Sequence, residues 1–403
     1  MNLRRTYHWL LLAVLAVCLT SCEGRRNGHG KDDRLSKTVV IYMVAENSLS
    51  YGNFHTQDQE EICRVAGSIP KDCRVVLYVD DTDYPRIYSV EPTKDGTNLK
   101  VLKAFTSEAD SCDPEMLKKV MYYVSNKYPS KSYGFVFWSH GSAWLPASAS
   151  APMRSIGVDN GRNKSADRGG SEMDIDELAE ALEEVENLDF ILFDACFMQS
   201  VEVAYELRKA AHFIISSPAE IPGPGAPYDV ILPYMLKPSA DIQGIVNGYY
   251  GCYATENSLY GVVLSAVDCR KLEALRDETR AMLLKYGSME VDNELPRLLK
   301  YYPLSDSSVP EYFDMKAYMH HIITDEVDWQ TWLLAFEAAV PFKQSTERWY
   351  SKYIEGYMYM GKQSDFGGVS MYVPEPGGFF LQKNNWFRDT AWYSASGWRE
   401  LGW

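Results

Sequence analysis

Two reactive side chains, an imidazole and a thiol, each follow a short apolar segment of this 403-residue chain. His140 comes just after the apolar run 133–138, and Cys196 comes just after the run 188–193. A cysteine attacks a carbonyl carbon as its thiolate, and a neighbouring histidine accepts and returns the proton. Taken alone, each residue is more often structural, because an unpaired cysteine is commonly buried and inert. Together they indicate nucleophilic catalysis, provided that the two segments lie side by side.

The elements that must position these residues follow from the hydrophobic pattern. A helix is expected after Asp113-Pro114, and a second after Asp174, where Glu177 completes a capping box. A third helix is expected directly after Cys196. Buried strands are predicted at six short apolar runs, namely 38–44, 73–79, 133–138, 188–193, 212–216 and 260–267. Strands that alternate with helices favour an α/β fold with a mainly parallel sheet flanked by helices.

In an open parallel sheet, functional groups gather at the carboxyl ends of the strands. We therefore expect His140 and Cys196 to face each other across one edge of the sheet. The helix expected after Cys196 would lower the pKa of the thiol through its partial positive charge. The backbone N–H groups of Gly141 and Cys196 are expected to stabilise the oxyanion of a tetrahedral intermediate.

The segments around these residues resemble the clostripain family of cysteine peptidases, which belongs to the caspase-like clan. The separation of His140 and Cys196 is close to the roughly 50 residues between the histidine and cysteine of caspases. The similar segments are Tyr42 to Leu49, Ser139-His140-Gly141, Asp194-Ala195-Cys196-Phe197-Met198 and Gly368 to Pro374. The resemblance implies a caspase-haemoglobinase-like fold, a Cys/His dyad and cleavage after Arg or Lys, often with calcium stimulation. This chain has Ser142 and Ala143 where the family commonly has glycines, which predicts a stiffer loop.

Acidic residues supply the expected specificity. A pocket for a basic side chain needs a carboxylate, because a buried cation without a partner is unstable. Asp194 matches the acidic position of the family, and Asp229 is a second candidate. The alternatives are a strand-end cap for Asp194 and a helix N-terminal acid for Asp229.

No cofactor is required for this chemistry, but calcium is a possibility that the sequence leaves open. Asp80, Asp81 and Asp83 follow the second predicted strand and offer the oxygen ligands that calcium prefers. A solvated acidic turn is the alternative. The histidines show no metal-ligand spacing.

The first residues read as an export signal. Arg4 and Arg5 precede an apolar run that is too short to span a bilayer, so residues 1–21 are predicted to be removed. Cys22 ends a stretch that resembles a lipobox, which predicts lipidation of Cys22, a polar tether over 22–36 and anchoring at the bacterial cell envelope. The alternative is an ordinary secretory signal with a chance cysteine. The formal charge of −15 disfavours a nucleic-acid partner.

Beyond the tether we expect a caspase-like α/β domain over 37–270 and a helical, aromatic-rich part over 271–403 that packs on it. Most of the ten tryptophans lie in this second part, and packing is preferred to a ligand platform as their role. The long polar stretch 142–171 carries basic residues and is either a site of self-cleavage or a solvated loop. The basic residues are Arg154, Arg162, Lys164 and Arg168.

The leading hypothesis is a lipid-anchored cysteine endopeptidase that acts on peptides or proteins. The alternative is a catalytically silent caspase-fold lipoprotein that binds peptide or protein at the same cleft. A thiol oxidoreductase is disfavoured, because the chain has no Cys-x-x-Cys motif.

Overall fold

The computed structural model describes residues 32–81, 83–94, 96–147, 155–161, 170–255, 258–302, 312–378 and 380–403. The predicted signal segment and Cys22 lie outside the described residues. Leu35–Trp403 forms one compact unit. Residues 37–270 and 271–403 both belong to this unit.

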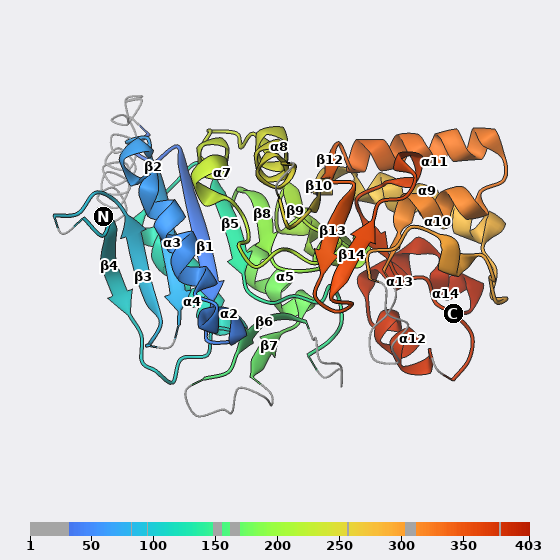
Figure 1. Cartoon of the computed structure of the whole chain (residues 1–403), viewed down its shortest axis with the longest axis horizontal. Helices are drawn as coiled ribbons and strands as arrows, with labels where there is room; N and C mark the ends of the chain where they lie inside the picture. Colours follow the sequence, from blue (N-terminus) through green and yellow to red (C-terminus); the bar gives the residue numbers. More distant parts are fainter. Residues whose placement is uncertain are drawn as a thin grey trace, which may run out of the picture. The chain divides into compact units, whose positions relative to one another are not determined.

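A nine-stranded sheet runs through the described part of this unit, in the order β12-β10-β9-β8-β5-β1-β2-β3-β4 (Figure 1). The five neighbouring strands from β2 to β9 are parallel, and the two outer strands at each edge are antiparallel. The α/β fold with a parallel centre is thus confirmed, whereas β3, β4 and β12 were not predicted. The strands are β1 (Lys37–Val44), β2 (Cys73–Asp80), β3 (Arg86–Val90), β4 (Leu99–Ala104), β5 (Tyr133–Trp138), β8 (Leu188–Asp194), β9 (Phe213–Ser216), β10 (Val263–Asp268) and β12 (Phe342–Ser345).

Helices cover both faces of this sheet, which is why the central strands are mostly apolar between their ends. One face packs against α3 (Phe54–Arg64), α7 (Tyr228–Met235) and α8 (Ile242–Tyr253). The other face packs against α4 (Pro114–Lys127), α5 (Ile175–Glu183) and α6 (Val201–Glu206). Asp113 caps α4, and the predicted capping box of Asp174 and Glu177 begins α5.

The C-terminal third adds further helices and short strands to the same unit. Trp332, Trp349, Trp392 and Trp398 are fully buried, in keeping with packing on the core. Within the family-like segment 368–374, the strand β15 is only two residues long. The elements are α9 (Leu272–Tyr286), α10 (Met315–Ile322), α11 (Glu326–Ala339), α12 (Leu381–Arg388), α13 (Ala391–Ser396), α14 (Trp398–Leu401), and the paired strands β11 (Phe313–Asp314) with β15 (Ser370–Met371) and β13 (Arg348–Ser351) with β14 (Gly356–Tyr359).

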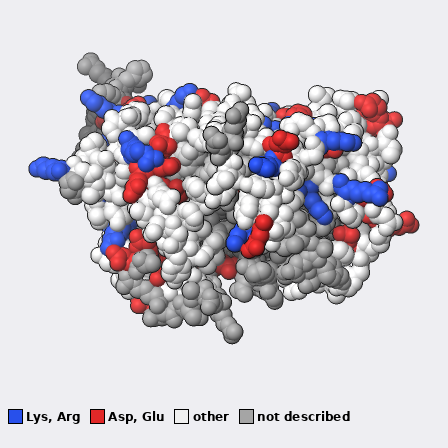
Figure 2. Space-filling view, viewed as in Figure 1, with Lys and Arg blue, Asp and Glu red and all other residues white. Residues whose placement is uncertain are grey.

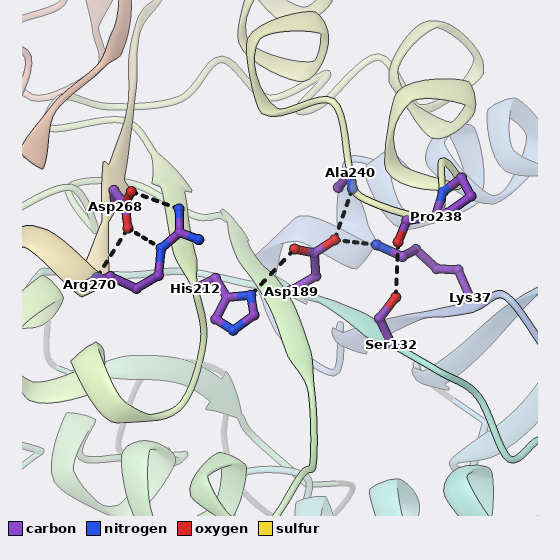
Figure 3. A network of polar contacts seen from close by, with 8 residues as sticks. All are labelled: Lys37, Ser132, Asp189, His212, Pro238, Ala240, Asp268 and Arg270. Atoms are coloured by element: carbon purple, nitrogen blue, oxygen red, sulfur yellow. Dashed lines mark hydrogen bonds and ion pairs between the residues drawn. The ribbon is translucent and has the colours of Figure 1, made fainter. Parts of the chain in front are cut away.

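A buried ion pair joins the strands at their amino ends (Figure 3). Lys37, at the start of β1, binds the carboxylate of Asp189 in β8, and the N–H of Ala240 donates to the same carboxylate over 2.8 Å. Burial lowers the pKa of Lys37, and Asp189 opposes this shift. Because an unpaired charge at this depth is strongly unfavourable, the pair favours one arrangement of β1 and β8.

Charges are mixed over the surface. On the face seen in Figure 2, acidic and basic side chains lie among one another without a continuous basic patch. None of the described helices combines the length and the apolar character that a membrane crossing needs.

Candidate active site

The parallel pairing of β5 with β8 brings the two reactive residues to one end of the sheet. Trp138 lies opposite Asp194 in the register, and His140 and Cys196 each follow two residues later. The two chain segments stay in contact beyond the strands. A Cβ atom added to Gly141 would lie only 2.9 Å from the carbonyl oxygen of Cys196, so this close approach requires glycine.

His140 is held from the side of β1. Its Nε2 atom lies 2.8 Å from the hydroxyl of Ser48, the first residue of α2 (Ser48–Tyr51). Asn47 caps this helix and donates from its amide to the carbonyls of Val44 and Val158, each over 2.8 Å. Burial lowers the pKa of His140, so its ring is neutral at neutral pH.

Ser139 ties the same three segments together. Its hydroxyl donates to the carbonyl of Val44 over 2.9 Å and lies 3.2 Å from the N–H of Val158, which donates to it. Val158 belongs to β6 (Ile156–Asp159), which pairs with β7 (Ser171–Met173). The stretch 142–171 therefore includes a strand that braces the histidine segment, and this was not expected. The four basic residues proposed for self-cleavage lie outside the described residues.

Cys196 lies in a turn, and the helix expected directly after it begins only at Val201 with Ser200 as its cap. The predicted effect of a helix N-terminus on the thiol is therefore wrong. Burial raises the pKa of Cys196 to about 12, although the N–H of Ile221 donates to Sγ over 3.3 Å and opposes the shift. At neutral pH the thiol of Cys196 and the imidazole of His140 are therefore both neutral.

Backbone strain accompanies both reactive residues. Phe197, next to the thiol, has a φ of 65°, and Ala143, three residues after the imidazole, has a φ of 61°. Left-handed backbone is unfavourable for residues other than glycine and persists where the surroundings enforce it. Ala143 occupies one of the two positions where the family commonly has glycine, and the stiffness expected of this loop stays a prediction.

Comparison with known proteins identifies the family. The sequence profile of the clostripain family matches residues 41–401. The chain belongs to the clostripain family of cysteine peptidases. Clostripain of Hathewaya histolytica is 31% identical over 165 residues, which cover 38% of this chain and 31% of that protein. The chain therefore matches about a third of the length of this relative.

Two solved structures match almost the whole fold. A secreted C11 cysteine protease from Bacteroides thetaiotaomicron, in complex with an irreversible peptide inhibitor, is 31% identical with a TM-score of 0.77. The match covers 90% of this chain and 99% of that chain. An inactive zymogen C11 protease from Parabacteroides distasonis is 27% identical with a TM-score of 0.74, over 90% of this chain and 98% of that chain.

In this clostripain-family site, Asp194 points to the face of the sheet that α7 and α8 cover. Its carboxylate accepts hydrogen bonds from the N–H of Ala226 and the hydroxyl of Tyr228, each over 3.0 Å. Gly225, with a φ of 65°, passes so close that a Cβ there would lie 2.8 Å from the carboxylate. Burial raises the pKa of Asp194 to about 6 despite these donors.

Asp229 is placed differently. It lies in the first turn of α7 and pairs with Arg64 over 2.9 Å. Its carboxylate is therefore already bound to a cation, as expected for the helix N-terminal alternative.

The acids considered for calcium are split apart. Asp81 accepts the N–H of Asp83 in a turn, and Asp83 pairs with Arg86. Asp80 instead groups with Glu46 and Asp159, with one oxygen of each within 4.8 Å of the others. Only one member of this group was named from the sequence.

Sequence reasoning also missed residues that later segments bring to the site. Burial raises the pKa of Tyr353, and Tyr353 lies close enough to Cys196 that a thiolate there would raise it further. Glu220 accepts the N–H of Lys352 over 2.9 Å, so the turn between β13 and β14 rests on the loop that contacts the thiol. No local pattern marks these residues, because their contacts span more than a hundred positions.

Ser48 was missed as well, and its contact gives a prediction. Replacing Ser48 with Ala removes the hydrogen bond at Nε2. If His140 has the acid/base role expected from the sequence, this bond would orient the ring and stabilise its imidazolium form. We expect kcat on a peptide substrate to fall about tenfold, since such a bond contributes about 1.4 kcal/mol. The acid limb of the pH–kcat profile should move to lower pH, because the histidine pKa falls further.

Ser48→Thr is the matched control, since it keeps the hydroxyl and should restore both the rate and the profile. An unchanged profile in Ser48→Ala would remove this role.

Proposed function

We propose that this clostripain-family protein is an endopeptidase in which Cys196 is the nucleophile and His140 the acid/base. The observation that carries the proposal is the common position of the two residues beyond the paired strands β5 and β8. Membership of the family and the relative bound to an irreversible peptide inhibitor support it.

In the proposed mechanism, the thiol and the imidazole separate charge only when a substrate is present. The proton of Sγ moves to His140, and sulfur forms a bond to the scissile carbonyl carbon. The carbonyl electron pair moves to oxygen, where the N–H groups of Gly141 and Cys196 stabilise the negative charge. When the C–N bond breaks, the imidazolium protonates the leaving amine. A water molecule, deprotonated by His140, then attacks the thioester carbonyl carbon, the C–S bond breaks, and the imidazolium returns its proton to Sγ.

The dyad is tested by removing the thiol. Cys196→Ala should lower peptide hydrolysis by a factor on the order of 10⁴ or more, because the remaining groups still bind substrate but no longer attack it. Cys252→Ala is the matched control, since Cys252 is an exposed free cysteine and its loss should leave the rate unchanged. Hydrolysis of a peptide library by all three proteins is the measurement.

Labelling without substrate checks the neutral resting state. Alkylation of Cys196 should rise about tenfold per pH unit between pH 7 and 9, because its pKa of about 12 lies far above this range. A plateau below pH 7 would contradict the neutral dyad. Peptide binding without hydrolysis in the wild type would instead favour the silent binding protein.

We propose Asp194 as the acid that selects Arg or Lys in the substrate. The Asp194 carboxylate accepts hydrogen bonds from neutral donors and has no cation bound to it in these contacts. A substrate guanidinium or ammonium that reached this carboxylate would form a buried ion pair with it. Arg should be preferred to Lys, because its planar fork binds a carboxylate through two bonds. Asp229, already paired with Arg64, contributes less.

The prediction for specificity uses two variants of the same hydrogen-bonded group. Asp194→Asn keeps the shape and removes the charge. The transition state for substrates with Arg or Lys should therefore lose about 2–5 kcal/mol of stabilisation, which is measured as a lower kcat/KM. Tyr228→Phe removes one donor and keeps the charge, so basic substrates should remain preferred.

Equal losses on basic and apolar substrates would assign Asp194 a structural role. A wild-type preference for small or apolar residues would contradict basic specificity outright.

We further propose that Cys22 anchors the protein at the bacterial cell envelope and that the peptidase acts on peptides or proteins there. The secreted relative supports an exported protein. Cys22→Ala should move the protein from the membrane fraction to the soluble fraction without loss of peptidase activity, since two acyl chains supply the anchor. Cys18→Ala, within the predicted signal, is the matched control and should stay with membranes. Persistent membrane association of Cys22→Ala would place the anchor elsewhere.

Self-cleavage within 142–171 and calcium binding complete the proposal. The inactive zymogen among the relatives supports activation by processing. Glu46, Asp80 and Asp159 would hold calcium, since their oxygens converge and the buried Oδ1 of Asp80 has no hydrogen-bond partner among the described residues. Bound calcium would supply charge compensation, because burial and Asp159 raise the pKa of Asp80 to about 8.

A further inference from the structure

An acidic cavity lies on the face of the sheet opposite Asp194. It has a volume of about 290 Å³ and is bounded by the loop after His140, the start of α5, helix α6 and the end of α12. Five of its lining residues are carboxylates, and none of the described lining residues is basic. The carboxylates are Asp174, Asp176, Glu202, Glu206 and Asp389.

Glu202 is the buried member of this group. The residue is 1% exposed, and one of its oxygens accepts the N–H of Tyr372 over 2.8 Å. The other oxygen, Oε2, has no hydrogen bond of normal geometry within the described residues, although the N–H of Glu202 itself and the hydroxyl of Ser200 oppose the rise that burial causes in the pKa of this carboxyl, to about 7. A buried acceptor without a donor is rare in folded proteins and indicates a missing partner.

Two indole rings line the same cavity. Trp144 packs against Tyr372 and Phe387, with ring centroids 5.2 and 5.7 Å away, and Trp386 lies on α12. Indole faces attract organic cations through the negative charge of the ring. Carboxylates beside indoles therefore favour a cation that also carries apolar or planar surface.

The spacing of the acids disfavours a metal ion. Where the structure is described, the three-carboxylate group with oxygens within 4.8 Å of one another is Glu46, Asp80 and Asp159, not a set from this cavity. The N-terminus of α5 is not a site for an anion either. Its backbone N–H groups already bond to the side chains of Asp174 and Glu177 in a capping box. An extended cation fits better than a point charge.

We propose that this cavity binds a guanidinium or ammonium group on a short aliphatic stem, as carried by a basic amino-acid side chain or a small free amine. Donors of the cation bind Oε2 of Glu202, and the stem packs on the indoles. The site is separate from the specificity pocket, because Asp194 contacts Ala226 and Tyr228 on the other face. Trp144 follows His140 by four residues and Glu202 follows Cys196 by six, so an occupant contacts both segments that carry the dyad.

Calorimetry with agmatine tests this site in the full-length Cys196→Ala protein at pH 8. We expect binding that weakens at least tenfold in Glu202→Gln, which keeps the shape and removes the charge. The same titration in Cys196→Ala/Asp194→Asn, which removes the charge of the proposed specificity pocket, isolates the cavity, and binding there should remain. Pentane-1,5-diol, a neutral analogue, should not bind.

A second variant keeps the proposal testable if Glu202→Gln does not fold. Asp176 and Asp389 are exposed, so Asp176→Asn/Asp389→Asn should fold and still weaken binding at least threefold. Acetyl-arginine N-methylamide then separates the sources of the cation. Binding of both probes assigns a peptide side chain, and binding of agmatine alone assigns a free amine. Absence of binding, or binding lost in Asp194→Asn but kept in the cavity variants, overturns the proposal.

Discussion

The parallel pairing of β5 with β8 is the interaction on which the rest of the site depends. It places Trp138 opposite Asp194 and so sets His140 and Cys196 at equal distances beyond the strand ends. Because side chains alternate between the faces of a sheet, a slip of one residue would turn this whole set to the wrong side. This register is stabilised by the apolar faces of the helices that pack on both sides of the sheet. The ion pair of Lys37 with Asp189 stabilises the amino ends of the strands.

Burial dominates the electrostatics of the molecule at the places where chemistry is expected. It lowers the pKa of His140 and raises the pKa values of Cys196, Asp194 and Glu202, in each case as the largest cause. The interior thus favours neutral side chains until a partner of opposite charge arrives. Backbone donors at fixed positions become important in such a setting, since they stabilise a developing charge without rearranging.

The sequence was sufficient for the centre of the sheet, because strands buried on both faces read as continuous apolar runs. The predicted run 133–138 matches β5 at both ends, and the capping signals at Asp113 and Asp174 began the helices as expected. The outer strands β3, β4 and β12 were missed because they are short and only partly buried. The start of α6 was misplaced, since apolar periodicity defines the face of a helix better than its first residue. Ser48 and Glu220 could not be identified from the sequence, because only the tertiary fold brings them near the segments of His140 and Cys196.

The two open edges of the sheet carry a consequence for how copies of the protein meet. An edge strand presents unpaired backbone groups, and another chain can extend the sheet there and begin an aggregate. Here β4 exposes Lys100 and Lys103, and β12 is only four residues long and carries Lys343. A shift in the ladder between β3 and β4 further interrupts the regular edge. Like charges and irregular edges oppose strand exchange between molecules, so crowding many copies together should leave them dispersed rather than fibrillar.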